Sequence, residues 1–215
     1  MIVFTVIFGR FAKIPSDGLP YAIFVFAGLL PWTFFSANIN QASMSLLNQQ
    51  SLLTKIYLPR LFIPASAVGS GLVDLMVSFV VFALLMAYYG IGLTWGVLAV
   101  PLLILLTTAA SLGAGLSLAA LIVTYRDFRY VVPFMVQSLM YLSPVIYPVS
   151  MVPPQWQPVL ALNPMAGIID GFRSALLGVP WNLTTLSISA AASLFLLVHG
   201  LFYFRKTERV FADIA

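Results

Sequence analysis

The sequence predicts an all-α protein, a polytopic bundle of transmembrane helices that forms one domain over residues 1–215. Composition is the first observation behind this prediction. Hydrophobic residues make up 61% of the chain and charged residues only 7%, whereas soluble domains carry roughly 25% charged residues. The second observation is where the charges are missing. Residues 75–125 contain no charged side chain, nor do residues 18–54, 130–169 and 174–204. A helix needs only about 20 apolar residues to cross a bilayer.

The same inventory excludes several kinds of chemistry. The chain has no cysteine and one histidine, so disulfides, thiol catalysis and histidine-rich metal sites are excluded. No carboxylate pair, nucleophile elbow, metal cluster or phosphate-binding glycine loop is present, so we expect no enzyme active site, cofactor or metal in this chain. The net charge of +4 is spread thinly over short connections and does not indicate a nucleic-acid partner.

The expected elements follow the apolar runs in order. The stretch 1–8 is too short to span and lacks the features of a signal peptide, so we interpret it as the end of a first span whose beginning is missing. A complete span with a kink at Pro31 follows. With the first one, the count is six spans with both termini inside; the complete spans are expected at 21–44, 64–89, 95–124, 131–147 and 181–204.

The segment 149–178 is too broken by prolines to span and too apolar to be a free loop. Within it, Asn163 as N-cap, Pro164 at the first helical position and Gly178 at the end delimit one helix. We expect this helix to dip into the outer leaflet, with Trp156 near the lipid headgroups.

Basic residues predict the orientation. Seven of the ten fall in alternate connections, so these connections should be cytoplasmic: Lys55, Arg60, Arg126, Arg129, Arg205, Lys206 and Arg209. Arg10, Lys13 and Arg173 would lie outside. Trp95, Trp156 and Trp181 would form an aromatic belt at the outer interface.

Several polar residues lie inside the expected spans. Asn38, Asn40 and Gln41 are too polar to face lipid and should face other helices or a watery path. Asp74 is the one acid well inside a span. Such acids are candidates for function, but we favour a hydrogen bond to a neighbouring helix because no span offers a basic partner.

Three further patterns leave alternatives open. The ridge of Ala109, Gly113 and Ser117 allows close helix packing, which we expect within one subunit rather than in a dimer contact. Asp170 and Arg173 share a helix face and could meet a polar substrate, but a mutual ion pair is favoured. One apolar, cationic loop suits either an interfacial helix or a docking surface for a cytoplasmic partner; it consists of Lys55, Ile56, Tyr57, Leu58, Pro59 and Arg60.

Taken together, these stretches resemble the ABC-2 family of exporter permeases. The resemblance rests on Gly28-Leu-Leu-Pro-Trp-Thr-Phe-Phe35, on Leu53-Thr-Lys-Ile-Tyr-Leu-Pro-Arg60, on Tyr125-Arg-Asp-Phe-Arg129, and on a C-terminal signature. That signature comprises Ser143-Pro-Val-Ile-Tyr-Pro148, Leu162-Asn-Pro-Met165 and Gly171-Phe-Arg173. Within the family, the chain is most similar to subunits that export lipid-linked polysaccharides such as O-antigen, capsule or teichoic acid.

The resemblance implies a homodimeric permease of the bacterial inner membrane with its C-terminus in the cytoplasm. Two separate ATPase subunits, which bind the ATP and Mg, would dock on the loop Lys55–Arg60 as a coupling element. The segment 149–178 would form a pair of re-entrant helices at the outer mouth, with Trp156, Asn163, Pro164, Asp170 and Arg173 along the substrate path. The alternatives are an ABC-2 exporter of drugs or lipids, a membrane enzyme of lipid or glycan metabolism, and an ion-driven transporter. The last two would need more ionisable residues than this chain has.

Overall fold

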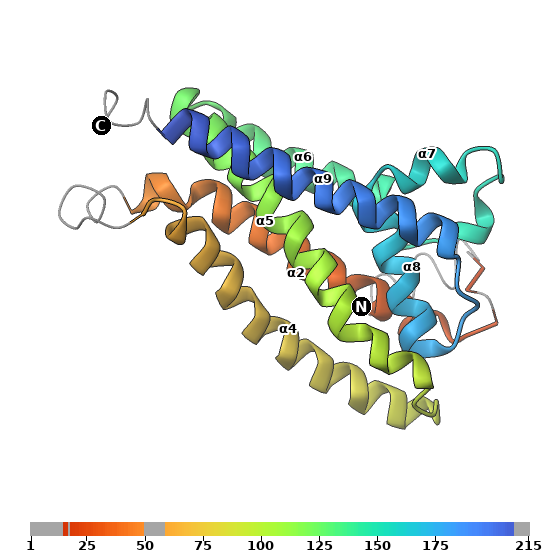
Figure 1. The fold of residues 1–215 in the computed structure, drawn as a ribbon. Coiled ribbons are helices and arrows are strands. Elements are labelled where there is room, and N and C mark those ends of the chain that lie inside the picture. The colour runs from red at the N-terminus through yellow and green to blue at the C-terminus, as the bar shows by residue number, and fades with distance from the viewer. Residues whose placement is uncertain (1–14, 17, 50–58, 209–215) are drawn as a thin grey trace.

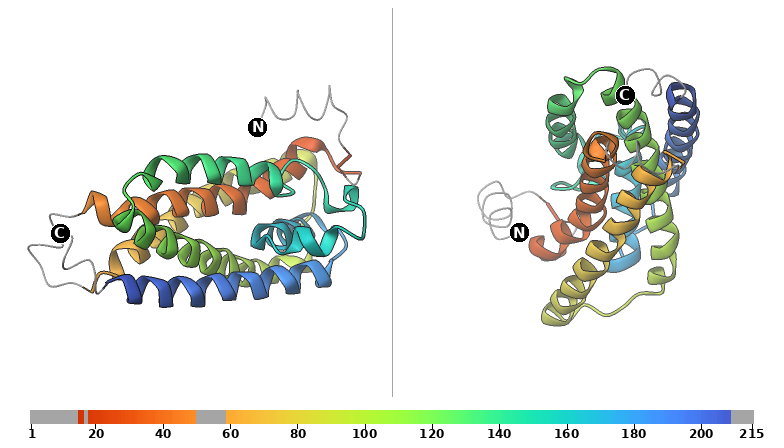
Figure 2. Two further views of the ribbon diagram at one scale, coloured as in Figure 1. Left: turned by 90° about the horizontal axis from the view of Figure 1, so that it is seen from above. Right: turned by 90° about the vertical axis from the view of Figure 1, so that its left-hand side faces the viewer.

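The computed structural model describes residues 15, 16, 18–49 and 59–208, and every regular element among them is helical. The long helices are α2 (Tyr21–Asn48), α4 (Phe62–Tyr89), α5 (Val100–Thr124) and α9 (Leu183–Glu208). They run side by side along the length of the molecule, as Figure 1 and Figure 2 show from different directions. The shorter elements are η2 (Trp95–Ala99), α6 (Phe128–Leu142), η3 (Val149–Met151), α7 (Gln157–Ala161) and α8 (Pro164–Leu177). The predicted all-α bundle is confirmed.

Four stretches within the described part of the chain are long and apolar enough to cross a membrane: Tyr21–Asn48, Phe62–Tyr89, Trp95–Thr124 and Leu183–Glu208. The span expected at 131–147 is wrong in its bounds, because α6 begins at Phe128 and ends at Leu142. Its 15 residues extend about 22 Å at 1.5 Å per residue, less than the roughly 30 Å of the hydrocarbon core. The next residues, Ser143 and Pro144, leave the helix because the residue before a proline disfavours the α conformation.

Helix α2 forms the centre of the bundle. It packs against α4, α5, α6 and α8, and its largest fully buried side chains include Phe24, Leu30 and Phe35. Pro31 lies inside the helix, which runs through it from Tyr21 to Asn48 without a break. The proline therefore removes one backbone donor but does not divide the span.

The backbones of α5 and α9 approach closely because glycines face each other. A Cβ added at Gly113 would collide with the α9 backbone at Leu196, and one added at Gly200 would collide with the Gly113 carbonyl. The predicted small-residue ridge therefore packs within one chain at Gly113. Ser117, one turn further along, lies 3.4 Å from Nδ1 of His199 on α9.

Candidate functional site

The basic connections gather at one end of the bundle. Figure 1 shows the end of α9, the start of α6, the end of α2 and the start of α4 at the same end of the molecule. Arg126, Arg129, Arg205 and Lys206 are exposed there. This arrangement agrees with the predicted alternation of basic and neutral connections.

At this basic end, the start of α4 is tied to the end of α9. Nη1 of the half-buried Arg60 donates a 2.9 Å hydrogen bond to the carbonyl of Glu208. Pro59 beside it is exposed. The predicted coupling residues Lys55, Ile56, Tyr57 and Leu58 lie outside the described residues.

The opposite end carries the predicted aromatic belt. Trp95 is 91% exposed in η2, Trp156 is 56% exposed before α7, and Trp181 is 40% exposed before α9. These residues belong to connections that follow α4, η3 and α8. The indole rings thus have the exposure that an interfacial position requires.

Helix α8 has the predicted ends, and its predicted dip into the outer leaflet stays a prediction. The Asn163 side chain accepts a hydrogen bond from the Met165 amide at 3.1 Å, and Gly178 ends the helix with a left-handed φ of 73°. Thirteen of its residues are buried, and Asp170 is half-buried. The helix packs against α2, α5 and α9, so it belongs to the interior of the bundle.

Arg173 on α8 is a buried cation that holds backbone segments together. Its exposed fraction is 1%. The guanidinium donates to the carbonyls of Val145 at 2.7 Å, Tyr147 at 3.2 Å and Phe24 at 3.4 Å. It also lies over the Phe24 ring, 3.7 Å from the centroid, where a cation interacts favourably with the aromatic face. We call this arrangement the arginine clamp.

Space for the clamp comes from a glycine on α2. A Cβ added at Gly28 would lie 2.8 Å from Nη2 of Arg173 and 3.1 Å from the Val145 carbonyl oxygen. Nearby, the Tyr21 hydroxyl donates to the Ile146 carbonyl at 3.1 Å. The predicted ion pair between Asp170 and Arg173 stays a prediction, but the clamp gives Arg173 a role that the sequence pattern did not indicate.

A second set of hydrogen bonds joins the start of α8 to the same turn. Nδ2 of Asn163 donates to the Ser143 hydroxyl at 2.8 Å. The Ser189 hydroxyl of α9 accepts from the Gly167 amide at 2.9 Å and lies 3.0 Å from the Ala161 carbonyl oxygen. The three stretches of the C-terminal signature therefore form one assembly in the structure.

The polar residues of the spans have different surroundings. Asn38 is fully buried against Gly71 of α4, and its side-chain amide makes no hydrogen bond. Nδ2 of Asn40 donates to the Ser36 carbonyl at 2.9 Å, and Gln41 is exposed. Asn38 therefore faces a neighbouring helix as predicted, whereas for Asn40 and Gln41 the expected contact with other helices or a watery path stays a prediction.

Asp74 lies on the exposed face of α4, beside the exposed Val73 and Val77. The hydrogen bond to a neighbouring helix that we expected for its carboxylate is not made within the described part of the chain. Ser70 and Ser78 lie one turn away on either side of it along α4, and the Ser78 hydroxyl donates to the Asp74 carbonyl at 2.9 Å. Among the described residues, no three side chains of His, Cys, Asp or Glu gather as a metal site.

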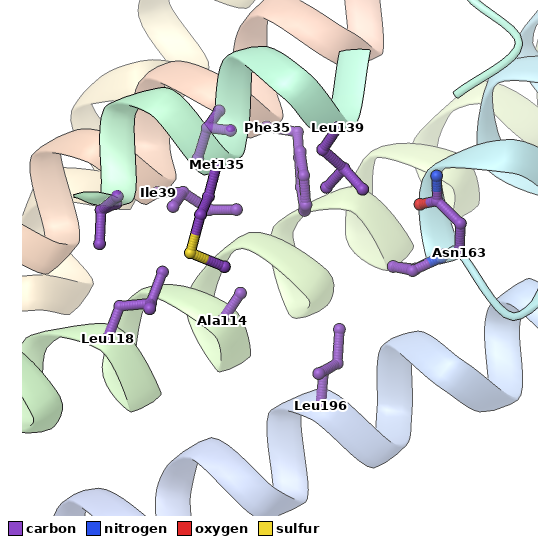
Figure 3. A pocket seen from close by; sticks show the side chains of 11 residues that line it. Phe35, Ile39, Ala114, Leu118, Met135, Leu139, Asn163 and Leu196 are labelled. Atoms are coloured by element: carbon purple, nitrogen blue, oxygen red, sulfur yellow. The ribbon is translucent and has the colours of Figure 1, made fainter. Parts of the chain in front are cut away.

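A half-open apolar cavity of about 250 Å³ lies between α6 and the rest of the bundle (Figure 3). Its walls come from α2, α5, α6, α9 and the start of α8. The sequence pattern does not predict this cavity, because its lining residues come from segments far apart along the chain.

Long apolar helices, basic connections at one end and exposed tryptophans at the other define an integral membrane protein. Comparison with known proteins identifies the particular family. Residues 1–177 match the sequence profile of the ABC-2 type transporter, so the chain belongs to the ABC-2 type transporter family.

Individual relatives of known name share less than a third of their residues with this chain. The O-antigen export system permease protein RfbA of Myxococcus xanthus is 29% identical over 176 residues, which are 81% of this chain and 67% of the relative. The inner membrane transport permease YadH of Escherichia coli (strain K12) is 29% identical over 188 residues, 83% of this chain and 73% of the relative. The polysialic acid transport protein KpsM of Escherichia coli is 25% identical over 222 residues, 97% of this chain and 81% of the relative.

Proposed function

We propose that this chain is the permease subunit of an ABC-type exporter that moves a lipid-linked polysaccharide across the bacterial inner membrane. The observation that carries the proposal is the family match over residues 1–177, joined to relatives named for O-antigen export and polysialic acid transport. In this proposal the permease acts as a homodimer, and separate ATPase subunits bind the ATP and Mg. The basic end and the C-terminus face the cytoplasm.

The ATPase docks on the loop Lys55–Arg60 at the basic end. Two features support this assignment. The loop lies directly before α4, and Arg60 bonds the end of α9 through the Glu208 carbonyl. A displacement of the loop by the ATPase would therefore act on two long helices together, which is the kind of element that can shift between two arrangements.

A charge-reversal experiment tests the docking. The double variant Lys55→Glu with Arg60→Glu should reduce both co-purification of the ATPase and polysaccharide export. The expected reduction is about tenfold, which lies within the range of typical coupling between two sites. The matched control is Arg205→Glu with Lys206→Glu, which changes the charge equally at the same end. Wild-type ATPase binding and export in the loop variant would exclude this loop as the contact.

The orientation is tested separately, since the chain has no native cysteine. Single cysteines in place of Arg126 and Arg205 should stay unlabelled by an impermeant thiol reagent in spheroplasts, whereas a cysteine in place of Trp156 should label. All three side chains are exposed in the structure. Labelling at position 126 or 205 would reverse the proposed orientation.

Cargo is tested by complementation. Expressed with its ATPase in a strain that lacks its own O-antigen or capsule permease, the chain should restore polysaccharide at the cell surface. YadH has the same 29% identity to the chain as RfbA of Myxococcus xanthus, and its name specifies no cargo. ATPase binding without any surface polysaccharide would therefore favour an ABC-2 exporter of another substrate.

A further inference from the structure

The cavity beneath α6 separates that helix from the rest of the bundle. Val132, Met135 and Leu139 of α6 line one wall, and Phe35 of α2, Ala114 of α5 and Leu196 of α9 line the facing walls. Figure 3 shows the side chains of Met135 and Leu139 on one side and of Phe35, Ala114 and Leu196 on the others pointing into the space between the helices. The lining residues of α6 extend from 132 to 139, about 10 Å along the helix axis.

The cavity offers a ligand almost no polar surface. Asn163 is the one polar residue in its lining. Its Nδ2 already donates to the Ser143 hydroxyl at 2.8 Å, and its Oδ1 accepts from the Met165 amide at 3.1 Å. A sugar or a water cluster placed there would lose hydrogen bonds without replacement, so the site suits an apolar occupant.

The surroundings of the cavity place it at the depth of the bilayer hydrocarbon. Phe134 of α6 is 72% exposed and Phe195 of α9 is 68% exposed, and both stand beside lining residues on their own helices. Helix α9 is long and apolar enough to cross a membrane, so an exposed aromatic side chain midway along it lies at the depth of the lipid tails. The half-open cavity is therefore within reach of hydrocarbon chains rather than water.

We propose that the cavity binds an acyl chain of a bilayer phospholipid, which fills the space between α6 and the bundle. The size agrees. An apolar cavity of about 150 Å³ holds benzene, so the volume of about 250 Å³ holds a hydrocarbon segment of roughly ten carbons on the same scale. The acyl chain of the lipid supplies the packing contacts that α6 lacks on this face. This proposal is independent of the exported cargo.

The test uses a phosphatidylethanolamine with a diazirine midway along one acyl chain. The purified full-length protein in detergent is incubated with a low molar ratio of this lipid, irradiated, and digested for mapping of adducts. Adducts are expected on the peptides that contain Met135, Leu139 and Leu196. Ala114→Phe, which fills the cavity, should lower their yield about tenfold.

Ala83→Phe is the matched control, because Ala83 is exposed on α4 away from the cavity. It should leave the adducts at wild-type yield. Leu196→Trp fills the cavity from α9 instead of α5, and it replaces Ala114→Phe in the test if the Ala114 variant does not elute as a folded, helical species. Unchanged labelling in the folded variant would overturn the proposal. Labelling by a diazirine polyprenyl phosphate but not by the phospholipid would also overturn it, because the occupant would then be an isoprenoid chain.

Discussion

The arginine clamp makes a strong prediction about stability. In Arg173→Met the aliphatic side chain still fills the site, but three backbone carbonyls lose a charged donor. One of these hydrogen bonds is short at 2.7 Å and two are longer, at 3.2 and 3.4 Å. Charged hydrogen bonds contribute about 1.5–3 kcal/mol each at good geometry. After the regained hydration of the guanidinium in the unfolded chain, we expect a net loss of about 3 kcal/mol.

The assay is thermal unfolding of the purified protein in detergent. A chain of 150–250 residues loses about 2–4 °C for each kcal/mol, so the Tm should fall by roughly 6–12 °C. The Tm of Arg173→Lys should lie between those of Arg173→Met and the wild type, because one ammonium group cannot reproduce the planar fork of the guanidinium. Arg126→Met, which removes an exposed cation, is the control and should change the Tm little.

A double-mutant cycle identifies the cause. Gly28→Ala places a methyl group 2.8 Å from Nη2 of Arg173, so it should destabilise the wild type more than it destabilises Arg173→Met. A Tm for Arg173→Met within about 2 °C of wild type, or strict additivity with Gly28→Ala, would refute the clamp as a source of stability.

Two glycine pairs give further predictions for the same unfolding assay. Gly71→Ala should lower the Tm by a few degrees, because its methyl group would collide with the buried Asn38 amide, whereas Gly69→Ala on the same helix meets open space and should not. An equal effect in both would remove steric contact as the reason. Gly113→Ala should push α5 from α9 and cost about 1–3 kcal/mol, while Gly92→Ala, with nothing within 4 Å, should be close to neutral; a neutral Gly113 variant would contradict the close approach of the two helices.

The elements that the sequence predicted well are those set by the bilayer or by local caps. The expected spans 64–89 and 95–124 match Phe62–Tyr89 and Trp95–Thr124 closely. Apolar length alone defines such helices. The ends of α8 were also predicted, because Asn163 and Gly178 act on the backbone within a turn of their own positions.

The parts that the sequence did not predict depend on contacts between distant segments. Arg173 stands three residues from Asp170, so an ion pair was the natural local interpretation. The carbonyls that Arg173 bonds lie 28, 26 and 149 residues away along the chain. Every residue type has a backbone carbonyl, so the sequence cannot indicate which of them accept these bonds. The shortened α6 was missed because an apolar run continues beyond the point where Ser143 and Pro144 end the helix.

The clamp also determines how this region can vary in sequence. The donor of the clamp is the Arg173 side chain, and the space for it exists because residue 28 is a glycine. The clamp therefore requires arginine at position 173 and glycine at position 28. Its acceptors are main-chain carbonyls, which every amino acid supplies, proline included. Position 147, where the side chain is half-buried, can therefore accept new residues without loss of its hydrogen bond, provided that the backbone keeps its path. Val145 is fully buried, so a new residue there must also keep the volume of the side chain, although the hydrogen bond itself does not depend on it.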